Sequence, residues 1–286
     1  MLPDLHGRVM IVTGANSGIG KATAAALSDL GAHVVLACRS EARGQAALAE
    51  LSAVPGRSLT LLRIDLADFS SVRAFAAAFS ARFDRLDALV NNAGMLGRKR
   101  QLTADGYEMQ LQVNFLSHFL LTMLLLPKLS AAPQGRVVML SSLAHAWTHV
   151  HFDDVNLSRD YNRFLGYGQS KLCNLMFCRA LAKRLNDAGS RVTINAAHPG
   201  IVASDIVVNR KNNALRWVAV LSRAVLLSPK QGARTSVFLA ADDSVSTVSG
   251  EYFIRCKIAP SSPESKNLAD AERLFELAAK ITGAPV

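Results

Sequence analysis

The segment Arg8–Gly20 reads RVMIVTGANSGIG and joins a β-branched strand to a glycine-rich turn and the start of a helix. In such a turn, Gly14, Gly18 and Gly20 permit a tight bend, close approach of a pyrophosphate and close packing of helix on strand. The spacing G-x-x-x-G-x-G departs from the commoner G-x-G-x-x-G, but the N-terminus of the helix still offers unpaired N–H groups to an anion. We therefore predict a phosphate-binding turn whose other members are Asn16, Ser17 and Ile19.

Apolar runs of strand length recur along the chain, and each is followed by a longer amphipathic segment. This alternation predicts β-α-β units, which build a parallel sheet with helices on both faces. A chain of 286 residues can bury the core of one such domain. We expect a single doubly wound α/β domain over residues 1–286 with about seven strands: Arg8–Thr13, His33–Ala37, Leu59–Ile64, Ala88–Asn91, Arg136–Ser141, Thr193–Ala197 and Tyr252–Ile254.

Two stretches interrupt the alternation: the polar residues 143–165, and residues 201–228, which contain the apolar run ALRWVAVLSRAVLLS. Both follow predicted strands, and ligands of open α/β sheets bind outside the carboxyl ends of the strands. We expect an inserted loop at 143–165 and a lid over the site at 201–228. The predicted helices are Gly18–Leu30, Glu41–Leu51, Ser70–Phe83, Leu102–Leu129, Gly166–Asp187 and Lys230–Ala240.

The composition is that of a globular protein, because half of the residues are hydrophobic and 19% are charged. The cysteines lack C-x-x-C spacing, so we expect four reduced thiols. No long apolar run precedes the glycine-rich turn, which favours a cytoplasmic protein without a signal peptide or N-terminal anchor. The net charge is +10, but Lys and Arg are scattered without interleaved aromatics. We expect no nucleic-acid partner, at most peripheral membrane contact, and an anionic cofactor.

The second predicted strand ends in HVVLACRS, where a site for NAD would usually carry a carboxylate for the adenosine ribose. Cys38 and Arg39 stand there instead, followed by Ser40. A carboxylate would repel a 2′-phosphate, whereas a guanidinium can pair with it through two parallel hydrogen bonds. A solvated surface arginine is the alternative interpretation. We favour NADP(H), with Arg39 and Ser40 at the 2′-phosphate.

The motif Tyr167-Gly-Gln-Ser-Lys171 begins a predicted helix, and its i to i+4 spacing places phenol and ammonium on one face. A neighbouring ammonium stabilises phenolate and lowers the pKa of a tyrosine, which makes it a usable acid or base nearer neutrality. Taken alone, this spacing is common on helix surfaces. The pair Ser141-Ser142 lacks the G-x-S-x-G elbow of hydrolases, so we do not expect a hydrolytic triad.

Several motifs occur together and in a fixed order: TGANSGIG, Asn91-Asn-Ala-Gly94, Asn114, Ser141-Ser142, YGQSK and Pro199-Gly200. In that order and those places they resemble the short-chain dehydrogenase/reductase family over nearly the whole chain. The resemblance implies a Rossmann-type fold and an oxidoreductase that interconverts a carbonyl and an alcohol with a nicotinamide cofactor.

The resemblance also implies roles for individual residues. Tyr167 would pass the proton to or from the substrate oxygen, while Lys171 lowers its pKa and holds the nicotinamide ribose. Asn114 would hold a water that links Lys171 to solvent. The residues themselves do not decide between Ser141 and Ser142 as the group that orients the substrate; the family's paired-serine motif favours Ser142. The implied cofactor contacts beyond the turn and Tyr167 and Lys171 are Asp65, Leu66, Asn91, Ala93, Gly94, Pro199, Gly200, Val202 and Ser204.

Two departures mark a subgroup of this family. Ser204 replaces the usual threonine after Pro-Gly, which keeps the hydroxyl that bonds the cofactor carboxamide. The segment between Ser142 and Tyr167 is much longer than in compact members. With S-S-L-A-H, H-P-G and a late Y-F-x-x-C-K at 252–257, the sequence resembles the retinol dehydrogenase and WW-domain oxidoreductase branch. Relatives there act on varied lipophilic carbonyls, so retinoid activity does not follow.

The predicted lid indicates the class of substrate. Trp217 and its apolar neighbours in 201–228 supply surface that would gain about 25 cal/mol per Å² when buried against a ligand. Packing of this segment on the domain or on a partner subunit is the alternative. We expect a small lipophilic carbonyl or alcohol substrate that contacts Ser142 and Trp217.

The histidines could suggest a metal site or a second acid–base group, and the fold allows a function other than catalysis. His145, His149 and His151 lie close in HAWTHVH, but no nearby cysteine or paired acid completes a shell, so we expect no metal and a flexible loop. His198 precedes Pro199-Gly200, where we expect a packing or positioning role. A non-catalytic dinucleotide-sensing or interaction module on the same fold is the alternative function. Monomer and homodimer are both compatible with the sequence.

Overall fold

One mixed sheet of eight strands organises the computed structural model, which describes residues 3–200 and 227–286. The strand order is β3-β2-β1-β4-β5-β6-β7-β8, and every neighbouring pair is parallel except β7 and β8. The seven predicted strands are confirmed, and the short antiparallel β8 is an addition. The bounds are β1 Val9–Thr13, β2 His33–Cys38, β3 Ser58–Arg63, β4 Ala88–Asn91, β5 Arg136–Leu140, β6 Thr193–His198, β7 Tyr252–Ile254 and β8 Lys257–Ile258.

The strand order reverses beside β1, which is the most important feature for a bound nucleotide. From β1 the chain moves outward to β2 and β3 and then returns to place β4 on the other side of β1. Loops that leave β1 and β4 therefore diverge at their carboxyl ends, and that crevice is where doubly wound sheets bind dinucleotides. β1 is an apolar run buried on both faces, as expected of a central parallel strand.

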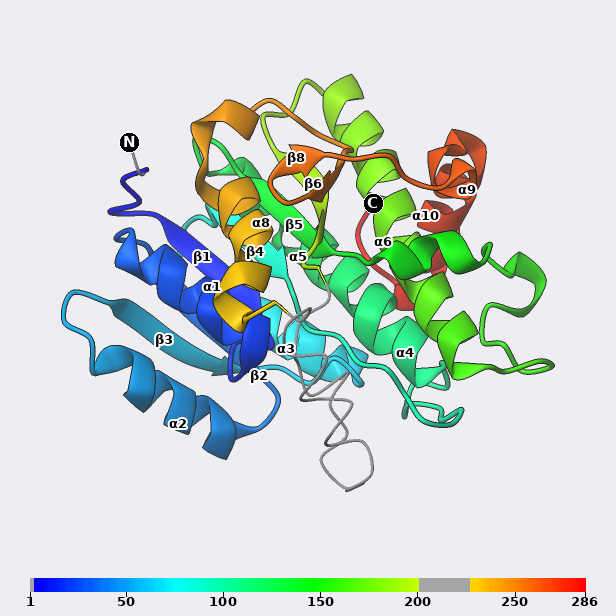
Figure 1. The fold of residues 1–286 in the computed structure, drawn as a ribbon, viewed down its shortest axis with the longest axis horizontal. Coiled ribbons are helices and arrows are strands. Elements are labelled where there is room, and N and C mark those ends of the chain that lie inside the picture. Colours follow the sequence, from blue (N-terminus) through cyan, green and yellow to red (C-terminus); the bar gives the residue numbers. More distant parts are fainter. Residues whose placement is uncertain (1–2, 201–226) are drawn as a thin grey trace.

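Helices cover both faces of the sheet, as Figure 1 shows. One apolar core joins the sheet to α1, α2 and α8, and the other joins it to α3, α5, α6 and α10. The bounds are α1 Gly18–Asp29, α2 Glu41–Ser52, α3 Phe69–Ser80, α5 Ser117–Ser130, α6 Arg163–Asp187, α8 Pro229–Ala241 and α10 Leu268–Thr282. The single doubly wound α/β domain predicted from the alternation is confirmed.

The helix predicted at Leu102–Leu129 begins later, with α4 at Met109–Leu111. Leu102 instead pairs with Glu108 in an isolated antiparallel bridge, which uses the backbone groups that a helix would need. A π-helical turn, η1 (Gln112–Leu116), connects α4 to α5. The whole stretch Met109–Ser130 is long and apolar enough to cross a membrane, but most of it is buried inside the protein as a core helix.

Residues 143–165 are more ordered than the loop expected from their polarity. They contain two 3₁₀-helical segments, η2 (Leu143–Trp147) and η3 (Phe152–Asp154), and they pack against α6. The side chain of Gln169 accepts from the His151 N–H and donates to the Val155 carbonyl. α6 begins at Arg163, three residues before the predicted start, because the Asn162 side chain caps it.

The chain after β8 forms two helices for which the sequence analysis made no prediction: α9 (Pro263–Lys266) and α10. α10 carries the ring of Phe275 to within 5.1 Å of the Phe119 ring on α5 and 6.1 Å of the Phe177 ring on α6. α10 therefore covers one side of α6, which carries Tyr167 and Lys171, and of α5, which follows the turn that carries Asn114.

Candidate active site

The glycine-rich turn joins β1 to α1 in the conformation that its glycines permit. Gly14 has a φ of +68°, in the left-handed region that favours glycine. A Cβ at Gly20 would lie 2.4 Å from both the Gly14 carbonyl oxygen and Asn92 Nδ2, so this contact excludes a side chain. Ser17 stands exposed at the N-cap of α1, with Asn16 and Ile19 half-buried beside it. The turn is shaped as an anion cradle at a helix N-terminus.

The end of β2 presents cations and no carboxylate. Cys38 is buried, and its thiol accepts hydrogen bonds from the N–H groups of Ala15 and Asn16; burial, the larger effect, raises its pKa to about 11. The next residue, Arg39, is exposed, and Ser40 caps α2 by accepting from the Arg43 N–H. Arg43 also lies close enough to act on the Cys38 thiol. It is a second cation that the sequence analysis missed, although its place one turn beyond Arg39 could have indicated it.

The cofactor contacts predicted after β3 and β4 differ in how accessible their side chains are. Asp65 is half-buried and accepts from the Ala67 N–H, while the Leu66 carbonyl accepts from Ser117. Asn91, expected beside the cofactor ribose, is only 1% exposed, and its amide donates to Thr122 and Met139. Its side chain thus faces the interior. Strand alternation turns the side chain away from the crevice, and the place of Asn91 beside the cofactor ribose stays a prediction for its main chain.

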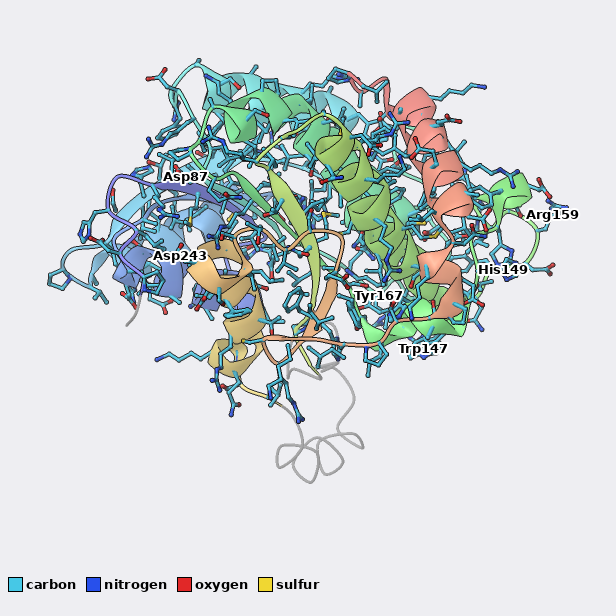
Figure 2. The ribbon with its side chains drawn as sticks, turned by 90° about the horizontal axis from the view of Figure 1, so that it is seen from above. Asp87, Trp147, His149, Arg159, Tyr167 and Asp243 are labelled. Carbon is cyan, nitrogen blue, oxygen red and sulfur yellow. The ribbon has the colours of Figure 1, made fainter. Side chains whose placement is uncertain are left out.

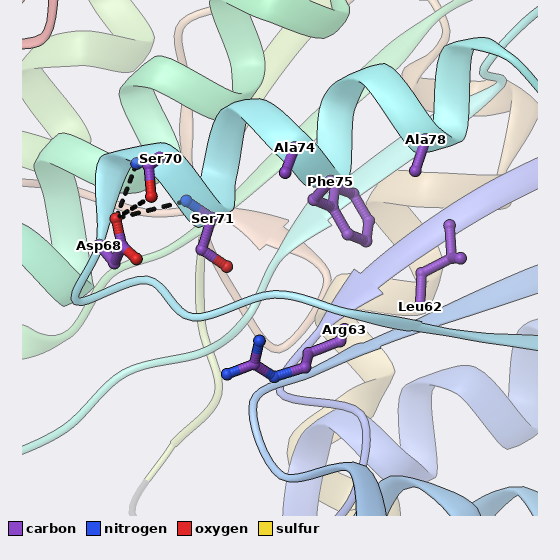
Figure 3. A pocket seen from close by; sticks show the side chains of 8 residues that line it. All are labelled: Leu62, Arg63, Asp68, Ser70, Ser71, Ala74, Phe75 and Ala78. Carbon is purple, nitrogen blue, oxygen red and sulfur yellow. Dashed lines mark hydrogen bonds between the residues drawn. The ribbon is translucent and has the colours of Figure 1, made fainter.

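A hollow between β3 and α3 lies outside this set of groups. It is lined by side chains that Figure 3 labels, among them Arg63, Asp68 and Phe75. The Asp68 carboxylate accepts from the N–H groups of Ser70 and Ser71 and so caps α3. None of the predicted site residues lines this hollow, and we assign it no function.

Hydrogen bonds to the hydroxyl of Thr13, the last residue of β1, hold the turn after β4 against the turn after β1. Thr13 Oγ1 accepts from the N–H groups of Asn92 and Ala93, and it lies 3.0 Å from His118 Nε2. His118 Nδ1 is 3.2 Å from the Asn114 carbonyl oxygen. Burial lowers the pKa of His118 to about 3, so the ring stays neutral and links the cofactor turn to the Asn114 main chain.

The side chain of Asn114 lies in the π-helical turn and is fully engaged. Its Oδ1 accepts from the Met95 N–H at 2.8 Å, and its Nδ2 donates to the Met95 carbonyl and to Ser170 Oγ. A Cβ at Gly94 would lie 3.4 Å from both Asn114 Oδ1 and Lys171 Nζ. Gly94, Asn114 and Lys171 are therefore brought together as predicted, although the Asn114 side chain itself holds protein groups.

Ser141 and Ser142 have different partners. Ser141 is 2% exposed, and its hydroxyl donates to the Lys171 carbonyl at 2.9 Å, which fastens the end of β5 to α6. Ser142 is half-buried; its hydroxyl accepts from the Ala144 N–H at 3.3 Å and lies close enough to the phenol of Tyr167 to lower the pKa of that phenol. The geometry thus selects Ser142 as the serine that faces the tyrosine, a choice that the residues alone left open.

Tyr167 lies in the second turn of α6 on the side where the inserted loop packs (Figure 2). Burial, the larger effect, raises its pKa, and the nearby hydroxyl of Ser142 lowers it. Lys171 Nζ lies 5.7 Å from the centroid of the Tyr167 ring and donates to the Leu140 carbonyl at 2.9 Å. Burial lowers the pKa of Lys171 to about 8. The net shift at Tyr167 is upward, unlike the expected lowering by Lys171, because the buried amine is directed at a carbonyl.

A second hollow lies at the ends of β6 and β7, lined by His198, Pro199 and Gly200 together with Leu143 and Ile254. Leu143 follows Ser142 in the chain, but the predicted catalytic residues themselves do not line this hollow. His198 is 7% exposed, and burial lowers its pKa to about 4, which supports packing over acid–base chemistry. The predicted contacts Val202, Ser204 and Trp217, and with them the lid, lie outside the described residues.

Of the three histidines of HAWTHVH, His145 departs from the expected loop: it lies in η2, is 2% exposed and is hydrogen-bonded at both ring nitrogens. His149 and His151 lie outside the helices and strands, with their ring centroids 4.2 Å apart. The polarity of a histidine does not reveal a buried partner, so the sequence did not indicate the burial of His145. Within residues 3–200 and 227–286, no three histidine, cysteine or acidic side chains gather as metal ligands.

Comparison with known proteins agrees with this geometry. The model of the short chain dehydrogenase family matches residues 8–214, which is most of the chain. The chain belongs to the short-chain dehydrogenase family. It is 43% identical to retinol dehydrogenase 11 of Mus musculus, over 99% of this chain and 89% of the relative. This short-chain dehydrogenase is therefore an oxidoreductase of the retinol dehydrogenase branch.

Two solved structures resemble this short-chain dehydrogenase over most or all of its length. A protein from Mycobacterium paratuberculosis is 32% identical with a TM-score of 0.80, covering 100% of this chain and 97% of that one. A protein described as an NAD(P)-dependent gluconate 5-dehydrogenase from Beutenbergia cavernae is 28% identical with a TM-score of 0.71, covering 88% and 96%, and has NADP bound at low occupancy. The Rossmann-type fold expected from the motifs is thereby confirmed.

Proposed function

We propose that this oxidoreductase uses NADP(H) to reduce a lipophilic aldehyde or ketone, or to oxidise the corresponding alcohol. The observation that carries the proposal is the approach of the Ser142 hydroxyl to the buried Tyr167 phenol, with the buried amine of Lys171 5.7 Å from the centroid of the same ring. A module that only sensed dinucleotides would have no need of this arrangement, because it costs the burial of an ionisable amine.

The chain's own residues fit a nicotinamide dinucleotide. Gly14 and Gly20 let the turn pack closely on itself and on Asn92, and the N-terminus of α1 that it leads into offers N–H groups to a pyrophosphate. Exposed Arg39 suits a 2′-phosphate, with Arg43 close by, and the positions directly after β2 are Arg39 and Ser40 where an NAD site would usually carry a carboxylate. The NADP bound to the relative from Beutenbergia cavernae supports the same choice.

The proposed chemistry divides between cofactor and protein. A bound nicotinamide supplies or accepts the hydride. In reduction, Tyr167 donates its phenolic proton to the substrate oxygen, and Ser142 holds that oxygen by a second hydrogen bond. Lys171 lies next to the ring, with Asn114 and Gly94 around it, and returns a proton to the phenolate. Oxidation runs the same steps in reverse, with Tyr167 as the base.

The lipophilic class of substrate rests on the hollow at the ends of β6 and β7 and on the relatives. Leu143, Ile254 and Leu227 line this hollow beside His198, which makes much of its described lining apolar. The similarity to retinol dehydrogenase 11, whose name refers to an apolar alcohol, supports the same class. The apolar sequence of 201–228 and the proposed contact of Trp217 add to this expectation.

NADPH oxidation measured against aldehydes of increasing apolar length tests the proposal. We expect kcat/KM to rise by up to roughly fourfold with each added methylene until the site is full, because burial of one methylene lowers the free energy of the bound transition state by up to about 0.8 kcal/mol. Tyr167→Phe removes the proton donor and keeps the ring, so turnover should fall by at least about a hundredfold at unchanged NADPH affinity. Wild-type protein that oxidises NADPH with none of these compounds, or Tyr167→Phe with near-normal turnover, would refute the proposal.

A further inference from the structure

A buried histidine lies directly behind the Ser142 main chain. The His145 ring, on η2, has its Nδ1 2.6 Å from the Ser142 carbonyl oxygen. The backbone N–H of His145 donates to the same oxygen at 3.1 Å. On its other side, His145 Nε2 lies 3.1 Å from the backbone N–H of Ser262, in the connection between β8 and α9.

These partners leave one protonation state for the imidazole. A carbonyl oxygen can only accept a hydrogen bond and a backbone N–H can only donate one, so Nδ1 carries the proton and Nε2 the lone pair. A second proton on Nε2 would face the Ser262 N–H and break that bond. Burial, the largest effect, lowers the pKa of His145, and the positive charge of Arg179 lowers it further; the hydrogen bond to the Ser142 carbonyl and the charge of Glu264 raise it, and the net shift of the pKa is downward. The ring is neutral at physiological pH and locked in one orientation.

The packing around the ring also fixes its position. The centroid of the Tyr252 ring lies 5.0 Å from that of His145, at an interplanar angle of 71°. Tyr252 is fully buried on β7, so it forms a rigid edge-to-face neighbour. The imidazole therefore connects two segments far apart in the sequence: the residue after β5 and the connection after β8.

Ser142 needs such a support because it stands where β5 has ended and the chain turns into η2. Its hydroxyl has to meet both the Tyr167 phenol and a substrate oxygen, so a small rotation of its peptide plane would move the hydroxyl. Ser141 is fastened on one side through the Lys171 carbonyl. The two N–H groups of His145 fasten the Ser142 carbonyl on the other.

We propose that His145 is a positioning residue that sets the orientation of Ser142 through its main-chain carbonyl and ties it to Ser262. This inference rests on the proposed function, in which Ser142 holds the substrate oxygen. Misplacement of a reacting group by about 1 Å can cost roughly a hundredfold in rate. Loss of the Nδ1 contact should therefore lower kcat more than it changes the KM for NADPH.

Two amide substitutions separate the two contacts of the ring. In His145→Asn the amide nitrogen takes the place of Nδ1–H, which keeps the bond to the Ser142 carbonyl and loses Ser262. In His145→Gln the amide oxygen takes the place of Nε2, which keeps Ser262 and loses the bond to Ser142. We expect kcat within about threefold of wild type for the first and a loss of about tenfold or more for the second, the size of one lost hydrogen bond.

The measurements are kcat and KM for the best aldehyde and for NADPH, with urea unfolding to check the fold. His149→Asn, an exposed histidine of the same segment, is the matched control and should keep wild-type kcat. His145→Leu, which lacks both contacts, should lose at least as much kcat as the Gln variant. Equal losses of kcat in the Asn and Gln variants, or loss of stability at unchanged kcat, would overturn the role of His145.

The imidazole can also be examined without turnover. Nitrogen-15 NMR of the side chain should show a ring that is neutral and protonated at Nδ1 at pH 7, with a pKa below the ordinary 6.5. An ordinary titration near neutrality would overturn the inference whatever the activity. If turnover depends on Tyr167 but does not differ among the His145 variants, the role of His145 is wrong and the proposed function stands. If the wild type is inactive with every carbonyl compound, the proposed function and the role of His145 are both wrong.

Discussion

Lys171 is a lysine whose amine is held inside the protein. The side chain is 4% exposed, and its Nζ donates to the Leu140 carbonyl. Burial lowers its pKa to about 8 from the ordinary 10.5. Because the charged form is disfavoured in the fold, the residue costs stability whenever it is protonated. Such a cost is typical of a group retained for chemistry.

Replacing this amine should stabilise the protein and inactivate it. Lys171→Met keeps an apolar stem of similar length, so we expect the free energy of unfolding at pH 7 to rise by on the order of 1–3 kcal/mol while turnover is lost. The folded pKa lies below the unfolded one, so the cost is full below about pH 8 and fades as the pH rises towards 10.5. Urea unfolding at pH 7 and at pH 10 measures the gap, which should narrow at the higher pH.

The exposed lysine Lys183 on the same helix provides the control. Lys183→Met should change the free energy of unfolding by no more than about 0.5 kcal/mol. A Lys171→Met protein less stable than wild type at pH 7, or a gap independent of pH, would contradict the account of the buried amine.

The guanidinium of Arg39 tests the choice of NADP(H) as cofactor. Loss of a charge-assisted pair with a 2′-phosphate should cost about 1.5–3 kcal/mol, or roughly ten- to a hundredfold in affinity. We expect Arg39→Ala to weaken NADPH binding selectively and to leave NADH binding unchanged, as measured by fluorescence titration. Arg82→Ala, an exposed arginine beyond α3, should affect neither. Equal losses for both cofactors, or a wild type that prefers NADH, would contradict the assignment.

At the scale of elements, two glycines explain how the inserted loop meets the catalytic helix. A Cβ at Gly166 would lie 2.9 Å from Gln110 Nε2, and one at Gly168 would lie 2.9 Å from the Ala144 carbonyl oxygen. These glycines flank Tyr167, so α4 and η2 approach the first turns of α6 where side chains would hold them apart. The Y-G-x-S-K pattern therefore includes a packing requirement as well as two chemical groups.

The C-terminal helix supports the same two catalytic helices from outside. Phe275 is 2% exposed between Phe119 and Phe177, and the guanidinium of Arg184 lies 4.1 Å from its ring centroid. α10 thus packs on both α5 and α6 and covers this side of the two helices.

The contribution of α10 can be measured at Phe275. Phe275→Ala should lower the free energy of unfolding by about 3–5 kcal/mol, because it leaves a cavity between α5, α6 and α10. Phe275→Leu, the matched control, fills most of that space and should cost less than about 1.5 kcal/mol. Urea unfolding of both proteins decides it, and similar small losses would mean that α10 is not part of the cooperative fold.

At the scale of the whole molecule, the sheet order assembles a site from segments remote in sequence. The turns after β1 and β4 meet through Thr13, and the residues after β5 meet α6 through Ser142 and Tyr167. All of these strands are parallel, so their carboxyl ends open at one edge of the sheet. Figure 2 places Tyr167 and Trp147 on the same side of the molecule, where the inserted loop packs.

The sequence by itself determined the doubly wound fold, its seven parallel strands and the glycine-rich turn, because these depend on local periodicity and on residues without a Cβ. It also placed Tyr167 and Lys171 on one helix face, since i to i+4 spacing is a local property. Boundaries shifted where a capping side chain or a bridge competed with the helix, as at Asn162 and Leu102.

Only the tertiary structure decided which serine faces the tyrosine, that Asn91 turns inward and that His145 is buried. Each of these depends on a partner more than a hundred positions away, across the sheet, or on another helix: Ser262 for His145, Thr122 for Asn91, and Lys171 for Ser141. The sign of the pKa shift at Tyr167 was settled in the same way. The burial of Tyr167 and the direction of the Lys171 amine depend on tertiary packing, which the spacing of residues within a motif does not determine.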